Sequence, residues 1–308
     1  MSAERSSPDL LRQEVVLGTR GSALALIQAN LAAEALRAAK GMAVQIEIIR
    51  TKGDESILSR DPRAGRKGLF TSELESALMQ GRVDLAVHSA KDLPTELRPG
   101  SAIAAVLPRG PVEDLLVTKC PMGLKSLPST PTIATSSVRR RRQACWRRSD
   151  VRFVDLRGNV PTRLRKFAAS DWDAIILARA GLERLSCSAP TFKFEGEEFF
   201  AEVLSPDQFI PSGGQGVIAL QTRIERTAIA SMIDHVPTHL CLRAEREFLR
   251  LLQGDCDLPV GAIARSIDGQ IELSAQLFTE QAEPKMASAS GTNPERVAAQ
   301  VFSQIDAR

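Results

Sequence analysis

Apolar residues in the first part of the chain recur as short runs and as stripes at helical spacing, a pattern typical of alternating strands and helices. Residues 14–17 predict a strand, and residues 44–48 alternate apolar and polar side chains as a half-buried strand does. Between them, residues 22–40 predict a helix, for which Ser22 is a good N-cap. Its apolar stripe is Leu24, Ile27, Leu31 and Ala35. Strand, helix and strand form a βαβ unit, which predicts a parallel sheet.

A long polar loop follows at residues 53–67, and we expect it to be a lid over a site. The helix after it has an apolar face made of Leu69, Phe70, Leu74, Ala77 and Leu78. Residues 83–88 predict the next strand. Ligands of parallel sheets bind beyond the carboxyl ends of the strands. The side chains at these ends are candidate site residues: Arg20, Ser22, Lys91 and Asp92.

The same pattern restarts in the next hundred residues and predicts a second α/β lobe. Strands are expected at residues 103–107, 115–118, 132–135, 151–156 and 173–178. Two of the strands end in hydroxyl or arginine side chains that open a helix. The residues concerned are Thr135, Ser136, Ser137, Arg139 and Arg140 at the first end, and Arg157 and Arg163 at the second. Helix N-termini favour anions, and arginine binds carboxylate or phosphate through two parallel hydrogen bonds.

The rest of the chain predicts a return to the first lobe and a third, smaller unit. Residues 186–208 are partly acidic and expected to be irregular, and the glycine-rich stretch 209–216 is interpreted as a tight crossing between lobes. A strand at 217–221 can return to the first lobe. A helix at 237–253 is followed by a hairpin about Asp268-Gly269, with strands at 262–266 and 270–277, and by a helix at 294–305.

The predicted fold class is therefore α/β, with two lobes and a small α+β C-terminal domain. Domain 1 is expected to contain residues 12–108 and 209–226, domain 2 residues 109–208, and domain 3 residues 227–308.

Charge is balanced overall but concentrated locally. The 308 residues include 40 Lys and Arg against 37 Asp and Glu, yet residues 139–166 hold eleven basic residues and two acids. Three interpretations remain open at this point: binding sites for small anions, a solvated basic face, and a nucleic-acid groove. The third is disfavoured, because nucleic-acid grooves use aromatic stacking platforms and the chain is only 4% aromatic, with no tyrosine.

The five cysteines are scattered and form no CxxC pair, so they predict neither a disulfide framework nor a zinc site. His235 and His239 have helical spacing but no acidic partner at a metal-motif position, and we expect no metal. His88 lies inside an apolar strand and is interpreted as a satisfied core histidine. The N-terminus lacks an apolar signal region, and no apolar run reaches membrane-spanning length. We therefore expect a cytoplasmic protein, or an organellar one whose transit segment has been removed, with no membrane and no nucleic-acid partner.

Cys256 is a candidate for chemistry, because it sits in Gly254-Asp255-Cys256-Asp257-Leu258-Pro259-Val260-Gly261, a composition typical of a tight turn. A thiol on such a turn is accessible to reagents. The alternative is a core cysteine that happens to lie beside a turn, and on spacing alone that alternative is the stronger one.

Several motifs occur in one order along the chain and resemble those of the porphobilinogen deaminase family, also called hydroxymethylbilane synthase. They are Gly18-Thr19-Arg20-Gly21-Ser22, Lys67-Gly68-Leu69-Phe70, Ala86-Val87-His88-Ser89-x-Lys91-Asp92-x-Pro94, Thr135-Ser136-Ser137-x-Arg139-Arg140, Leu156-Arg157-Gly158-Asn159-Val160-x-Thr162-Arg163-Leu164, Gly214-Gln215-Gly216 and Gly254-x-Cys256-x-x-Pro259-x-Gly261. The resemblance covers roughly residues 14 to 280.

The resemblance implies two lobes like those of type II periplasmic binding proteins, with the active cleft between them. It also implies a dipyrromethane cofactor, held by a thioether to Cys256. On this primer the family joins four porphobilinogen molecules, each losing ammonia, and releases hydroxymethylbilane. The protein is expected to act as a monomer.

Residue roles follow from the matched motifs. Asp92 matches the catalytic aspartate, whose carboxylate can accept pyrrole N–H bonds and stabilise the positive azafulvene formed on deamination. The residues implied in cofactor binding are Lys91, Thr135, Ser136, Ser137, Arg139 and Arg140. Those implied in substrate binding are Arg20, Ser22, Arg157, Arg163 and Gln215. Each pyrrole carries an acetate and a propionate, so the growing chain is a polyanion that needs such cationic junctions.

Some positions depart from the family pattern: Asp255, Arg179, Ser212-Gly213 and the extension of the arginine pair by Arg141 and Arg142. None of them removes a named catalytic group. The alternative function, from another class, is a non-catalytic two-lobed binding protein for a carboxylate-bearing small molecule, which would need neither Cys256 nor Asp92.

Overall fold

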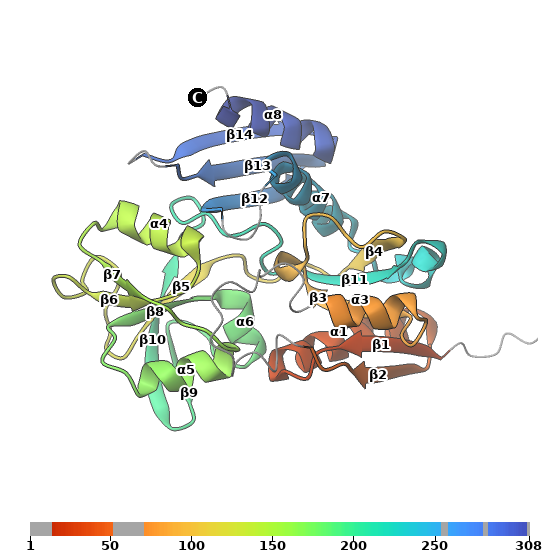
Figure 1. Cartoon of the computed structure of the whole chain (residues 1–308), viewed down its shortest axis with the longest axis horizontal. Helices are drawn as coiled ribbons and strands as arrows, with labels where there is room; N and C mark the ends of the chain where they lie inside the picture. The colour runs from red at the N-terminus through yellow and green to blue at the C-terminus, as the bar shows by residue number, and fades with distance from the viewer. Residues whose placement is uncertain (1–13, 52–70, 254–257, 280–282, 307–308) are drawn as a thin grey trace, which may run out of the picture.

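A computed structural model describes residues 14–51, 71–253, 258–279 and 283–306 of the chain. The described residues form three β-sheets, of five, six and three strands, each covered by helices. The five-stranded and six-stranded sheets lie side by side as two lobes, and the three-stranded sheet packs above both of them (Figure 1).

The first sheet is mixed, which corrects the expectation of a parallel sheet: the βαβ strands are parallel as predicted, and one strand is reversed. Its strands, in the order in which they pair, are β2 (Val44–Ile48), β1 (Val15–Thr19), β3 (Leu85–Ser89), β11 (Ile218–Arg223) and β4 (Ser101–Val106). β1 runs parallel to β2 and β3, whereas β11 runs antiparallel to both β3 and β4. β11 returns from the second lobe, and its direction is set by that return.

Helices cover both faces of this sheet, because residues on alternate sides of its strands are apolar. α1 (Ala23–Lys40) packs Ala29, Ala32 and Leu36 against Leu17 and Leu85 on one face. α3 (Ser72–Met79) packs Leu74 and Leu78 against Val83 and Ala86 on the other. The two faces hold β3 in a rigid layer, and the site residues follow at its carboxyl end.

The second lobe has a mixed sheet with the order β7 (Arg152–Val154), β6 (Thr132–Ala134), β8 (Ala174–Ala178), β5 (Asp114–Thr118), β10 (Glu197–Leu204) and β9 (Thr191–Phe194). Its helices are α4 (Val138–Arg147), α5 (Val160–Ala168) and α6 (Arg179–Arg184). The expectation of irregular structure over 186–208 was wrong, because β9 and β10 form an antiparallel hairpin. Phe192 and Phe199 from this hairpin are buried in the core, and that burial outweighs the weak strand pattern of its acidic residues.

The third unit is an antiparallel sheet of β12 (Val260–Ile267), β13 (Gln270–Leu277) and β14 (Lys285–Gly291), covered by α7 (Val236–Leu251) and α8 (Pro294–Asp306). The predicted hairpin is confirmed, and Asp268 and Gly269 both have positive φ angles, 49° and 77°, as a two-residue hairpin turn requires. The sequence pattern missed β14, whose residues are mostly small and polar.

The chain crosses between the lobes twice, over residues 107–113 and over residues 205–217, and the two crossings contact each other. The main-chain N–H of Gly110 donates to the carbonyl oxygen of Gly216 over 3.1 Å. Gly216 has a φ of 85°, and a Cβ there would lie 2.5 Å from the Gly110 oxygen, so only glycine fits. The short 3-10 segments η3 (Ile224–Ile229) and η4 (Ser231–Ile233) then follow β11 and contact β4. None of the described helices is both long and apolar enough to span a membrane.

Candidate active site

Asp92 ends a 3-10 turn, η2 (Ala90–Asp92), that follows β3 directly. Ala90 at the start of the turn and Leu93 just after it are both buried. The N–H of Ala90 also donates to the carbonyl oxygen of Val217 over 3.0 Å. With these two side chains turned inward, Asp92 is left exposed and Lys91 half-buried. The strand-end position predicted from the sequence is therefore confirmed for both residues.

Positive charge from both lobes gathers around this turn. The pKa of Lys91 is lowered to about 8, mainly by burial; the nearby charges of Asp92 and Asp114 raise it, and those of Arg140 and Arg163 lower it. Burial also lowers the pKa of Arg163 to about 10, again with a contribution from Arg140. Like charges placed this close destabilise one another until an anion joins them. The structure thus brings Lys91 and Asp92 of the first lobe together with Arg140 and Arg163 of the second.

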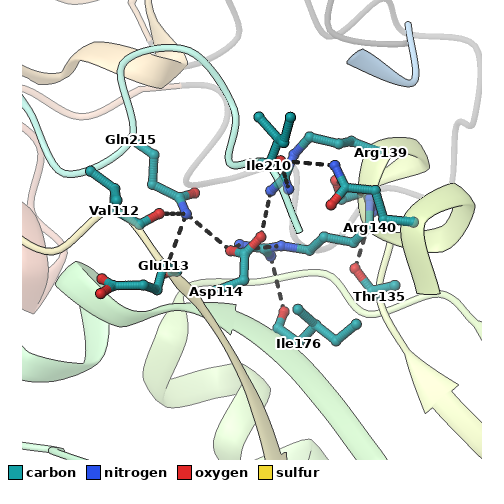
Figure 2. A network of polar contacts seen from close by, with 11 residues as sticks. Val112, Glu113, Asp114, Thr135, Arg139, Arg140, Ile176, Ile210 and Gln215 are labelled. Carbon is teal, nitrogen blue, oxygen red and sulfur yellow. Dashed lines mark hydrogen bonds and ion pairs between the residues drawn. The ribbon is translucent and has the colours of Figure 1, made fainter. Parts of the chain in front are cut away.

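Beneath this cluster lies a buried ion network centred on Asp114, at the start of β5 (Figure 2). The Asp114 carboxylate accepts hydrogen bonds from Arg139 Nη2 at 2.7 Å, Arg140 Nη2 at 2.7 Å and Gln215 Nε2 at 3.1 Å. Burial on its own would raise the pKa of Asp114, but the two guanidinium groups hold that pKa well below its usual range. Asp114 is therefore a permanent anion inside the fold.

The remaining donors of the two arginines also bind the protein itself. Arg139 Nη1 donates to the carbonyl oxygen of Ile210 at 2.8 Å, and Arg140 Nη1 to that of Ile176 at 2.9 Å. Only 5% of Arg139 and 6% of Arg140 is exposed. Gln215 is fully buried and donates to Val112 O at 2.7 Å. The structure thus places these three predicted binding residues in an internal network.

Sequence reasoning missed Asp114, the residue that organises this network. Its signal was an acidic residue at the head of the otherwise apolar run Leu115-Leu116-Val117. An acid that begins a buried strand needs cationic partners, and the arginine pair at 139–140 was available as a match.

The predicted hydroxyl residues hold the strand-to-helix junctions. Ser22 Oγ accepts from the N–H of Ala25 at 3.3 Å, and Ser137 Oγ accepts from the N–H of Arg140 at 3.4 Å, so these two serines cap α1 and α4. The N-cap predicted at Ser22 is confirmed.

Thr135 and Ser136 are also bound to the main chain. The buried Thr135 accepts from the N–H of Ser137 at 3.3 Å, and Ser136 Oγ accepts from the N–H of Leu156 at 3.0 Å. Both contacts shape the junction at which α4 begins.

Arg20, Arg157 and Arg163 differ in their surroundings. Arg20 follows β1 in sequence and is half-buried. The pKa of His88 is lowered to about 4, mainly by burial and to a smaller extent by the charge of Arg20. Arg157 is exposed. Arg163 Nε donates to Gly158 O at 2.7 Å, which fixes its guanidinium group over the N-terminus of α5. All three lie at the predicted strand-to-helix junctions.

The position predicted for cofactor attachment, Cys256, lies outside the described residues, as do Asp255 and the predicted lid at 53–67. The residues that follow Cys256 are bound to the crossing between lobes: Ala262 N donates to Pro211 O at 2.9 Å. A Cβ on Gly261 would lie 2.6 Å from the oxygen of Ile210, the same oxygen that binds Arg139. The strand after Cys256 therefore touches the arginine network.

Other predicted features have structural partners. Arg179 pairs with Glu113 at 3.2 Å and Glu183 at 2.6 Å, and Arg141 with Asp155 at 2.6 Å.

His88 is buried as predicted, but no hydrogen bond to its Nε2 is found among the described residues, so the expected satisfied histidine is confirmed in its burial only. His239 pairs with Asp234 at 2.9 Å, and His235 caps α7. Within the described part of the chain, no group of three or more His, Cys, Asp or Glu side chains could hold a metal ion.

Comparison with known proteins identifies the family. Residues 15–231 match the family model described as porphobilinogen deaminase, dipyromethane cofactor binding domain, and residues 239–304 match porphobilinogen deaminase, C-terminal domain. The porphobilinogen deaminase of Roseiflexus castenholzii is 44% identical over 259 residues, 82% of each chain. That of Moorella thermoacetica is 38% identical over 302 residues, 96% of this chain and 94% of the relative.

Among solved structures, the chain also matches more distant proteins. One is the periplasmic aliphatic sulphonate binding protein SsuA of Escherichia coli, 14% identical with a TM-score of 0.39, covering 78% of this chain and 70% of that one. The two lobes and the C-terminal domain agree with the predicted fold class. The chain belongs to the porphobilinogen deaminase family, the transferases that join four porphobilinogen molecules onto a dipyrromethane primer and release hydroxymethylbilane and ammonia.

Proposed function

We propose that Asp92 is the catalytic carboxylate of this reaction, and that Lys91 and Arg163 bind the carboxylates of the pyrrole chain beside it. The observation that carries this proposal is the exposed Asp92 among cations of both lobes that depress one another's pKa values. An anionic ligand would relieve that repulsion, and the ligand class of this family is anionic on every ring.

The cationic residues fit the dipyrromethane cofactor, whose acetate and propionate groups make it a polyanion. When bound, the cofactor supplies the pyrrole terminus to which each new ring is added. Cys256, matched by motif, is the attachment point. The strand that follows it touches Ile210, whose oxygen binds Arg139, so attachment there would set the primer beside the arginine network.

Asp92 has two roles in this proposal. As a carboxylate it accepts pyrrole N–H bonds and stabilises the positive charge that develops when ammonia departs. When it transiently holds a proton, it can deliver that proton to the leaving amine. Its exposure on a turn that is anchored by buried neighbours gives it access to substrate without losing its position.

The predicted binders divide into two sets. Direct contact with carboxylates is assigned to the residues that are exposed or only partly buried: Arg20, Lys91, Arg157 and Arg163. Arg139, Arg140 and Gln215 are assigned to the framework below, where Asp114 holds them. Ser22, Thr135, Ser136 and Ser137 shape the helix N-termini that face the ligand, and their main-chain N–H groups favour anions there.

The test combines intact mass with turnover. Wild-type protein is expected to carry a covalent dipyrromethane adduct that Cys256→Ser abolishes. Asp92→Asn is expected to keep the adduct while porphobilinogen consumption falls at least a hundredfold. Asp171→Asn, an exposed aspartate of the second lobe, is the control. Near-normal turnover by Asp92→Asn, or an adduct that survives in Cys256→Ser, would refute the assignments.

A non-catalytic binding protein is not favoured as the alternative, because both family models of the enzyme match and together reach from residue 15 to residue 304.

For the domains, we assign β1–β4, β11, η3 and η4 to the first, since η3 and η4 pack on β4. The third domain then begins after Ile233, later than the predicted residue 227.

We also propose that the enzyme is a cytoplasmic monomer. The four cysteines among the described residues, Cys120, Cys145, Cys187 and Cys241, are free thiols, as in a reducing compartment. The large apolar side chains exposed on the described surface are scattered over both lobes and the third unit rather than gathered on one of them. Sedimentation equilibrium would test the oligomeric state, and a mass near twice 33.4 kDa would contradict it.

A further inference from the structure

Arg246, on α7 of the third unit, is a half-buried cation that binds only main-chain oxygens among the described residues. Its Nη2 donates to Pro94 O at 2.8 Å and to Thr95 O at 2.9 Å. No carboxylate of the described residues forms an ion pair with it, and burial lowers the pKa of its guanidinium group. Partial burial of a cation without an ionic partner costs free energy of folding. The contacts that Arg246 makes are therefore worth examining for a role.

The two carbonyls belong to the segment that leaves the Asp92 turn. Pro94 and Thr95 follow Asp92 closely in sequence, and Leu93, which lies between Asp92 and Pro94, is buried. Leu93 packs in one apolar cluster with Leu242, which lies one turn before Arg246 on α7. The same face of α7 therefore contacts the side chain of Leu93 and the main chain just after it.

The neighbouring residue of α7, Glu245, fixes the other side of the turn. Its carboxylate is fully buried and accepts from Gly214 N at 2.6 Å and from Arg109 Nη1 at 2.6 Å. Gly214 lies directly against η2, because a Cβ there would be only 2.9 Å from Lys91 N. The Asp92 turn is thus held between the Glu245 side and the Arg246 side of one helix.

α7 is also the helix after which the chain reaches Cys256. It ends at Leu251, and β12 begins at Val260, so the position predicted for the primer follows this helix in sequence. The helix that contacts the Asp92 turn is therefore also the helix that precedes the attachment point in sequence. The contact between α7 and the segment after Asp92 joins the third unit to the first lobe.

We propose that Arg246 is a positioning residue that holds the Asp92 turn in place relative to α7, and so relative to the primer. The assignment rests on the roles of Asp92 and Cys256 given under the proposed function. It predicts that losing the Arg246 contacts lets the turn shift, which slows each addition without preventing the primer from being attached or porphobilinogen from binding.

The experiment compares Arg246→Gln, Arg246→Lys and the control Arg243→Gln, a surface arginine of the same helix paired with Glu295. For each we would measure cofactor loading by intact mass, kcat and KM for porphobilinogen, and the melting temperature. Arg246→Gln is expected to load the cofactor and to lose ten- to a hundredfold in kcat, with KM changed less than threefold. Arg246→Lys is expected to recover part of kcat, and Arg243→Gln to behave as wild type.

The outcomes separate the alternatives. Unchanged kcat in Arg246→Gln, or a loss of cofactor loading that Arg246→Lys shares, would overturn the positioning role. A rise in KM alone would point to substrate binding and would overturn it as well. Asp92→Asn is measured in parallel: if that variant is inactive while Arg246→Gln is normal, only the positioning role fails. If Asp92→Asn is active, the proposed function itself fails.

Discussion

The guanidinium group of Arg139 donates to the carboxylate of Asp114 across 2.7 Å, and neither side chain is more than 5% exposed. Arg140 shares the same carboxylate at 2.7 Å. Two cations and one anion leave a net positive charge inside the second lobe, directly beneath Lys91 and Arg163. The network therefore both orders the junction where α4 begins and raises the positive potential of the site above it.

Asp114→Asn is expected to destabilise the protein strongly. The substitution removes the anion but leaves two buried guanidinium groups, which typically costs about 3–5 kcal/mol of unfolding free energy. Urea denaturation measures this loss, and the matched control is Asp155→Asn, whose exposed pair with Arg141 should contribute little. Equal stabilities of the two variants would show that the buried network does not hold the lobe together.

Gly216→Ala is expected to disturb the contact between the two crossings. The added Cβ would lie 2.5 Å from the oxygen of Gly110, at a φ of 85° that alanine rarely adopts. Gly196→Ala is the control, since its φ is 92° but nothing lies within 4 Å of the added atom. The control should lose about 1 kcal/mol from backbone strain alone. We expect Gly216→Ala to lose clearly more, measured as a lower midpoint in urea.

The charge of Lys91 should make substrate capture pH-dependent. Its pKa is lowered to about 8, mainly by burial, so the side chain is charged below that pH and becomes neutral above it. Binding of a carboxylate raises this pKa again, and kcat/KM for porphobilinogen should therefore decline at pH values at or above 8. Lys91→Arg, which stays charged, is expected to move the decline to higher pH. A profile identical to wild type would exclude Lys91 as its cause.

His88 is expected to make the protein sensitive to acid. Burial lowers its pKa to about 4, whereas an unfolded chain titrates near 6.5. Between those two pH values the unfolded state binds a proton that the folded state does not, so stability falls as the pH is lowered. The slope from this group is at most about 1.4 kcal/mol per pH unit. Urea midpoints of wild type and His88→Gln at pH 7 and pH 5 should differ in slope, and parallel slopes would contradict the burial effect.

Local sequence pattern was sufficient for the elements whose residues interact mainly with near neighbours. The N-cap at Ser22 and the hairpin about Asp268-Gly269 depend on contacts within a few residues, and both are confirmed. The strand end at Lys91 and Asp92 follows from the apolar run before it. The pattern was weaker where a strand is buried by distant partners. β10 alternates imperfectly in sequence, and it is held in the sheet by pairing with β5 and by packing of its Phe199 with Phe192.

The candidate site divides in the same way. Motif order identified the family, and the local pattern placed Lys91 and Asp92 at a strand end, because a strand and the turn that follows it are neighbours in sequence. The burial of Arg139, Arg140 and Gln215 around Asp114 could not be predicted, since the anion comes from another strand. The hydrogen bonds from Arg246 to Pro94 and Thr95 could not be predicted either, because Arg246 lies 152 and 151 residues from them in sequence.

The sequence by itself determined which chemical groups this protein carries and at which strand ends they occur, because apolar periodicity and capping act locally. Only the tertiary structure decided which of those groups remain available to a ligand. Ionic partners and close backbone contacts join segments that the chain keeps far apart, so that some of the predicted binding residues are buried while others stay accessible.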